Sequence, residues 1–286
     1  MAEIVDRQNG QSRVGRRGSY FSASRRISMS LALTAVLIVL PPVIAVAAVR
    51  TLMLRYLTPN MIATAEKVVP YILGSLGGFF GLLAGFMLSN SWVELRALRS
   101  AMTAEVNAVA DLQDIAANLP QPYDDELRHS INTYLETVID RELPLMAARE
   151  VSPATTAALT ELWAPLGHFQ PQNDAEVSVR ELGMEKVMDI GEQRRQRIVF
   201  SRERMPGLLW WVLVGSGGVI VIGTCIVCLN YQRPTGAFLG ALTVLVALVL
   251  FSIQVLERPF QYGLSPESSD YSSLWIALGG PQTFRR

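Results

Sequence analysis

The chain has little charge and very little histidine or cysteine. Only 17% of its 286 residues are charged, with 25 basic against 25 acidic residues, and it has 2 His and 2 Cys. A zero balance gives no sign of a nucleic-acid partner, and the two isolated histidines, His129 and His168, argue against a metal site. No nucleotide-binding glycine loop, Ser/His/Asp set or paired-carboxylate site stands out. We therefore expect no catalytic residue, metal or cofactor, and a protein that is not an enzyme.

Charge is absent altogether from four long apolar stretches, 29–49, 68–92, 207–229 and 236–256. Each is about as long as the roughly 20 residues that a helix needs to cross a ~30 Å hydrocarbon layer. Because backbone groups must be satisfied within the segment there, a helix is the expected form. The sequence predicts an all-α membrane protein with four transmembrane helices, two on either side of a polar block. The missing intramembrane charge also argues against an ion-coupled transporter.

The basic residues are distributed unevenly between the segments that flank these stretches. Twenty-one of them lie in the N-terminal tail, the central block and the C-terminal tail, and only 4 lie in the two short loops. The positive-inside rule then places both termini and the central block in the cytoplasm. We predict a basic, disordered tail (1–28), helices one and two (29–92), a cytoplasmic helical bundle (93–206), helices three and four (207–256) and a cytoplasmic tail (257–286).

The first apolar stretch allows a second interpretation. Arg25 and Arg26 precede it and Ala45-Val46-Ala47 lies near its end, as in a twin-arginine signal peptide with a cleavage site. Its 21 residues exceed the roughly 7–15 of a secretory apolar region, which favours a retained helix. Pro41 and Pro42 should kink or break that helix.

The polar block is predicted to be helical throughout. An apolar stripe continues the second stretch without a Gly or Pro through Leu95, Leu98, Met102, Val106 and Val109, so one helix is expected over 68–118. Further helices are expected over 124–148, from Ser152-Pro153, and over 174–204, the last leading directly into the third stretch. Cys225 and Cys228 have the spacing of a redox or zinc pair but are better explained as buried apolar residues.

The second stretch has two distinct faces. At about 100° per residue, one side carries Gly74, Gly77, Gly81 and Gly85, and the opposite side carries Phe79, Leu83, Phe86 and Asn90. One interpretation is a glycine face packed within the subunit and an aromatic face in lipid. The other is a ring of these helices lining a pore, with the bulky residues forming a hydrophobic gate.

An ordered set of motifs over about 35–275 resembles the bestrophin-like family of bacterial membrane proteins. The motifs are 79–90 followed by Trp92 and Arg96–Arg99, then Glu105, Leu119-Pro120, Tyr134 with Asp140-Arg141-Glu142, the basic helix 194–197 leading to 205–210, and Glu257-Arg258-Pro259-Phe260. The resemblance implies a pentameric anion channel with a cytoplasmic helical region and a pore lined by the second helix. The chain departs from bestrophins at Gln261–Ser265, where their calcium-binding acidic run is absent, and at Leu143, where a tryptophan is usual. Calcium gating is therefore not expected.

The residues and the resemblance together predict an oligomeric inner-membrane channel for inorganic anions. In this hypothesis Phe79, Leu83, Phe86 and Asn90 line the pore, and the partners are the bilayer and further copies of the chain. The alternative is a non-conducting membrane scaffold or sensor whose cytoplasmic helices bind a partner protein.

Overall fold

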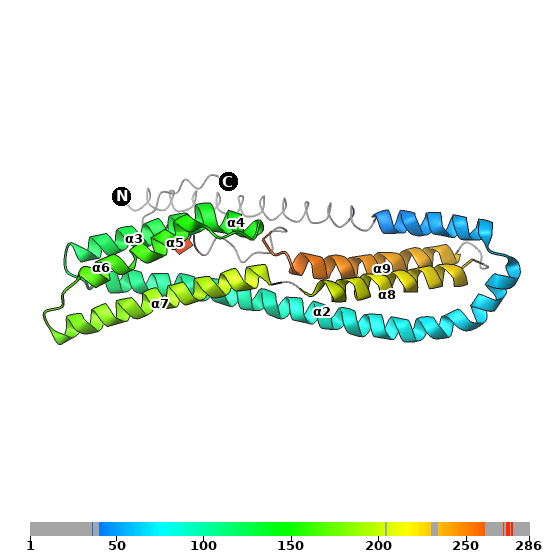
Figure 1. The fold of residues 1–286 in the computed structure, drawn as a ribbon, viewed down its shortest axis with the longest axis horizontal. Helices are drawn as coiled ribbons and strands as arrows, with labels where there is room; N and C mark the ends of the chain where they lie inside the picture. Colours follow the sequence, from blue (N-terminus) through cyan, green and yellow to red (C-terminus); the bar gives the residue numbers. More distant parts are fainter. Residues whose placement is uncertain are drawn as a thin grey trace, which may run out of the picture. The chain divides into compact units, whose positions relative to one another are not determined.

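The computed structural model describes residues 36, 40–203, 205–229, 234–260, 271, 273, 274 and 276. Their regular elements are all helical, with no strand in these ranges. Figure 1 shows α2 (Pro59–Ala116), α3 (Tyr123–Thr137), the π-helix η1 (Val138–Glu142), α4 (Leu143–Ala147), α5 (Pro153–Glu161), α6 (Trp163–His168), α7 (Asp174–Arg202), α8 (Gly207–Val227) and α9 (Pro234–Leu256). A further helical run covers 40–56.

The chain divides into two units. The membrane unit lies within 1–88 and 205–254, and the bundle unit lies within 89–204 and 255–286. Among the described residues, three helical stretches are long and apolar enough to cross a membrane: α2, α8 with the residues before it, and α9. The first predicted crossing lies partly outside the described residues, and its part 40–49 is helical. The protein is thus a multi-pass membrane protein.

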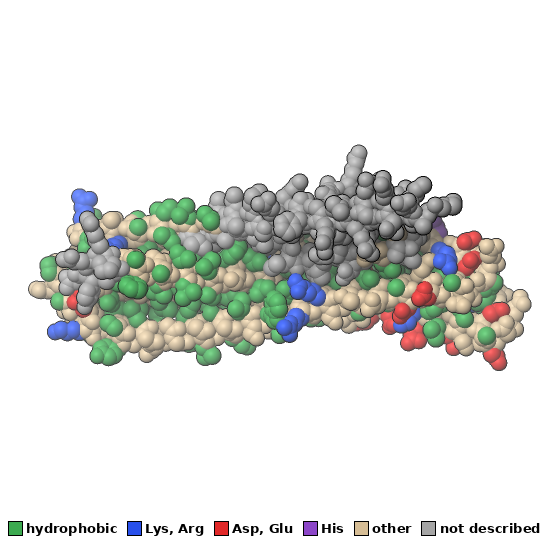
Figure 2. All heavy atoms as spheres, turned by 180° about the vertical axis from the view of Figure 1, so that it is seen from behind, with side chains coloured by type: hydrophobic (Ala, Val, Ile, Leu, Met, Phe, Trp, Pro, Cys, Tyr) green, Lys and Arg blue, Asp and Glu red, His purple; other side chains and the backbone are tan. Residues whose placement is uncertain are grey.

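The membrane unit is held by contacts of α2 with α8 and α9. Phe80, Ala84 and Met87 of α2 pack in a cluster with Leu213 of α8 and Ile253 of α9. A second cluster joins Val221 and Cys225 of α8 to Leu239 and Val246 of α9. In Figure 2, hydrophobic side chains cover much of the visible surface of this unit, as expected for a surface in contact with lipid.

Two predicted boundaries were wrong. The first loop, expected over 50–67, is almost entirely helical, because α2 already begins at Pro59 and the run before it ends at residue 56. Hydropathy marks the part of a helix that lies in hydrocarbon, whereas the polar turn around Lys67 contains good helix formers and simply continues it. The helix α7 also ends at Arg202, two residues before the predicted end, because Glu203 after it has a non-helical backbone.

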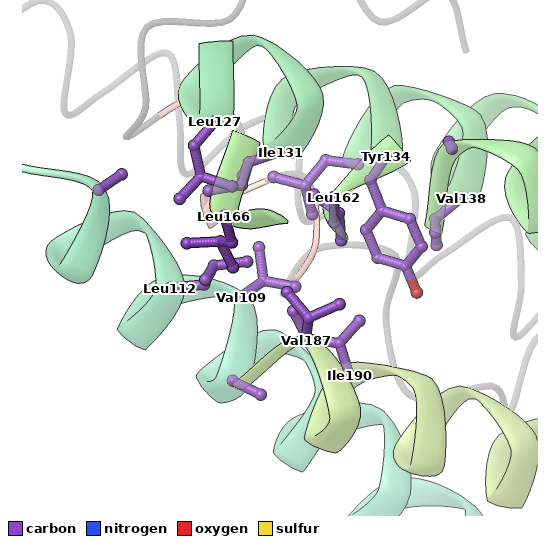
Figure 3. Packing of buried hydrophobic residues seen from close by; sticks show 14 of the residues in the cluster. Val109, Leu112, Leu127, Ile131, Tyr134, Val138, Leu162, Leu166, Val187 and Ile190 are labelled. Carbon is purple, nitrogen blue, oxygen red and sulfur yellow. The ribbon is translucent and has the colours of Figure 1, made fainter. Parts of the chain in front are cut away.

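The bundle unit has one apolar core. Figure 3 shows Val109 and Leu112 from α2 meeting side chains of α3, α6 and α7. The predicted stripe is confirmed at Leu95, Leu98, Met102 and Val109, which are buried, while Val106 is half-buried against the same core. Ser152 caps α5 through its hydroxyl and Asn173 caps α7 through its amide oxygen, so the predicted helix starts are confirmed.

Candidate functional site: the exposed flanks of α2 and a buried ion-pair network

The helix α2 has three faces in the membrane unit, and among the described residues one of them packs against other helices. That face carries Phe80, Ala84 and Met87. On one side of it lie the predicted packing glycines Gly74, Gly77, Gly81 and Gly85. A Cβ built at any of the four would meet nothing within 4 Å. No described residue therefore packs against this glycine flank, and its role in helix packing stays a prediction.

The other side of α2 carries an exposed aromatic flank. Phe79 is 52% exposed, Phe86 61% and Leu82 76%. Leu83, predicted to share this flank, is half-buried and packs against the cluster of Ala84 and Met87. Leu82 takes its place, because at about 100° per residue positions 79, 82 and 86 fall within roughly 60° of one another.

The polar residues that follow this flank along α2 make local contacts. The side-chain amide nitrogen of Asn90 donates to Glu94 Oε1 over 2.7 Å, and the guanidinium of Arg96 lies 5.3 Å from the ring centre of Trp92. Both contacts join residues one turn apart, so they stiffen the helix as it enters the bundle unit.

Glycines that bring membrane helices together inside the protomer lie on α8 instead. A Cβ on Gly217 would be 3.0 Å from Val246 and 3.2 Å from Phe80, and one on Gly223 would be 2.7 Å from Leu73. The sequence did not single them out, because the glycines of α2 form the longer series at helical spacing. Cys225, next to this seam, is a buried free cysteine and Cys228 is a half-buried one.

The bundle unit contains a buried network of charged side chains. Glu105 and Glu142 are fully buried, and so is Arg197, while Arg194 is 5% exposed. In the sequence these residues stand out only as parts of the motifs that resemble the bestrophin-like family. The signal was nevertheless present, because Glu105 interrupts the apolar stripe of α2 at the 3–4 spacing of its buried positions.

Arg197 is the centre of the network. Its Nε donates to Glu105 Oε2 over 2.8 Å, and its Nη2 donates to Glu105 Oε1 over 3.0 Å and to Glu142 Oε2 over 2.7 Å. Arg194 donates twice from Nε and once from Nη2 to the Glu142 carboxylate. The Tyr134 hydroxyl donates to Glu105 Oε1 over 2.8 Å. The charges of two carboxylates and two guanidinium groups thus neutralise one another in the protein interior.

The π-helical turn explains why Glu142 can join the network. In an uninterrupted α-helix Glu142 would be rotated about 80° from Tyr134, eight residues earlier. The turn Val138–Glu142 takes up one additional residue and returns Glu142 to the buried side, together with Tyr134 and Val138.

Tyr271 joins the C-terminal part of the chain to the network. The guanidinium of Arg197 lies 5.7 Å from its ring centre, and the ring is fully buried. The motif residues before it, Glu257–Phe260, line a small recess with Met146, Arg149 and Ser201. Phe260 also packs against the bundle core. The network therefore connects α2, η1, α7 and the segment after α9.

The network perturbs the protonation of its members. Burial raises the pKa of Tyr134 well above its usual range, and the adjacent Glu105 carboxylate raises it further. Burial acts to lower the pKa of Arg197, but Glu105 foremost among its neighbours raises it well above the ordinary value. Both groups are thus held in the form that the hydrogen bonds require, a neutral phenol and a charged guanidinium.

The family model for the Bestrophin-like domain matches residues 41–268. That match covers well over half of the chain, so the chain belongs to the Bestrophin-like domain family. No curated protein matches the chain. No solved structure matches it either.

Proposed function

We propose that the protein is an oligomeric ion channel of the inner membrane, that it passes anions, and that α2 lines its pore. The observation that carries the proposal is that, among the described residues, nothing packs against two flanks of α2. One flank is made of glycines with open space around them, and the other carries Phe79, Leu82 and Phe86.

The two flanks suit two different neighbours. Small residues three or four positions apart allow membrane helices of adjacent copies to approach closely. Copies arranged in a ring through this flank would turn the aromatic flank of each α2 toward a common axis. Membership of the Bestrophin-like family supports such a ring, and the resemblance to bestrophins suggests five subunits.

The aromatic flank would act as a hydrophobic constriction. Apolar side chains leave a narrow pore dry, and stripping the hydration shell from an ion is costly, so such a constriction gates by wetting and dewetting. No acidic residue lies between 68 and 92, so the flank itself does not repel an anion. The distribution of basic residues supports an orientation with the bundle unit in the cytoplasm.

The constriction can be tested with matched phenylalanine variants in reconstituted vesicles. Phe79→Ala should raise anion flux because the constriction becomes wider and easier to hydrate. Phe238→Ala is the control, since Phe238 is 74% exposed but lies on α9. The anion flux of Leu82→Ala should be closer to that of Phe79→Ala than the anion flux of Leu83→Ala is. In a chloride gradient, the reversal potential of the most active variant should follow chloride rather than sodium.

The oligomer can be tested separately by measuring the mass of the purified complex in detergent. Gly81→Leu should reduce the assembled fraction, whereas Gly240→Leu on α9, also with nothing within 4 Å, should not. If the wild type is a monomer, or if neither it nor the constriction variants pass current at any voltage, the channel proposal fails. The scaffold or sensor that binds a partner through its bundle would then take its place.

A further inference from the structure

The membrane unit contains an open apolar groove of about 310 Å³ between the helical run 40–56, α8 and α9. Residues from all three helices line it, among them Pro42, Val46, Val214, Gly218, Val221 and Val246. The hydroxyl of Thr243, also in the lining, donates to the Leu239 carbonyl of its own helix over 2.8 Å. The groove therefore offers hydrocarbon contact and almost no polar group.

The groove has the depth of one bilayer leaflet. Its lining on α8 extends from Val214 to Cys225, which are eleven steps apart, or about 16 Å at a rise of 1.5 Å per residue. That is roughly half of the ~30 Å hydrocarbon thickness. An object that fills the groove would thus be apolar, elongated and one leaflet long.

A cationic side chain lies at one end of the groove. Val49 lines this end and is followed directly by Arg50. A guanidinium nitrogen of Arg50 lies 3.0 Å from where a Cβ of Gly236 would be, in the first turn of α9. Among the described residues, none forms an ion pair with Arg50. A charge placed at the membrane interface without a partner favours an anionic group there.

We propose that the groove binds one acyl chain of an anionic phospholipid, with the headgroup phosphate on Arg50. A phospholipid supplies both parts that the site requires, a leaflet-long hydrocarbon chain and a negative charge at its interfacial end. An apolar helix of a second copy would fill the groove but would leave Arg50 without a counter-charge. None of the residues that line the groove belongs to α2, so the proposed lipid site does not depend on ion conduction.

The test is headgroup selection by the full-length protein. The protein is reconstituted in vesicles of phosphatidylethanolamine with a minority of phosphatidylglycerol and extracted, and retained phospholipids are identified by native mass spectrometry. The wild type should retain phosphatidylglycerol with a roughly fivefold preference over its share in the vesicle. This factor corresponds to about 1 kcal/mol for one basic side chain near the surface.

Two variants separate the headgroup from the chain. Arg50→Gln should keep a bound phospholipid but lose the preference for phosphatidylglycerol. Gly218→Phe should lose the lipid, because Gly218 lines the groove and a Cβ built there meets no atom within 4 Å, which leaves the ring free to occupy the groove. The control is Gly215→Phe, which is equally unobstructed but lies outside the lining and should keep both lipid and preference.

Several results would overturn the proposal. One is a phosphatidylglycerol preference that persists in Arg50→Gln. Another is equal retention of lipid in Gly218→Phe and Gly215→Phe. A third is a change in the mass of the complex on Gly218→Phe alone, which would mean that another copy covers the groove. If neither glycine variant folds, the headgroup preference of Arg50→Gln decides the matter alone.

Discussion

Replacing Arg197 with methionine should destabilise the bundle unit strongly. The substitution preserves the length and apolar stem of the side chain but removes the three hydrogen bonds to Glu105 and Glu142. Glu142 keeps Arg194 as a partner, so Glu105 becomes the uncompensated charge, with only the Tyr134 hydroxyl left to it. Breaking a fully buried ion pair by removing one partner costs about 3–5 kcal/mol.

Thermal unfolding of the purified protein, followed by tryptophan fluorescence, is a suitable assay. At about 2–4 °C for each kcal/mol in a domain of this size, the midpoint should fall by roughly 6–20 °C. Arg195→Met is the matched control on the same helix. Its pair with Glu192 is exposed, with Arg195 at 67%, so solvent screens it and the midpoint should change little.

A double variant distinguishes the lost pair from lost packing. If the cost comes from the unpaired Glu105 carboxylate, adding Glu105→Leu to Arg197→Met should recover part of the midpoint, because no buried charge is then left without a partner. If Arg197→Met melts close to the wild type, or if the double variant is the sum of the two single ones, the network does not stabilise the bundle as argued.

Three further results are expected. Because the folded-state pKa of Tyr134 is raised, its contribution is fully present below the unfolded value of about 10 and is lost as pH rises above it; Tyr134→Phe should therefore flatten the alkaline fall of the unfolding midpoint, and an unchanged slope would contradict this. Gly217→Leu should lower the midpoint by overpacking against Phe80 and Val246, at a cost of about 1–3 kcal/mol, and Gly215→Leu should not. An impermeant thiol reagent added to intact cells should label Asn60→Cys and not Asp125→Cys; labelling of the latter would reverse the proposed topology.

The sequence by itself determined the membrane character, the all-helical fold and the amphipathic stripe of α2. Each of these depends on local regularities, namely the hydropathy of about 20 consecutive residues and the 3–4 spacing of apolar side chains. Caps at Ser152 and Asn173 are equally local, which is why the starts of α5 and α7 could be predicted. Hydropathy, by contrast, placed the start of α2 at residue 68, although Thr58-Pro59 repeats the pattern of a capping residue before a proline, because a helix can continue beyond the hydrocarbon layer.

Only the tertiary structure decided which faces of these helices are packed. Gly74 and Gly81 have the same small-residue spacing as a packed seam, yet the seam inside the protomer is formed by Gly217 and Gly223 of another helix. Likewise Glu105 and Arg197 are 92 residues apart in sequence, and nothing local indicates that they form a pair. Burial makes that pairing obligatory, since a charge removed from water must find its counter-charge wherever the fold brings one.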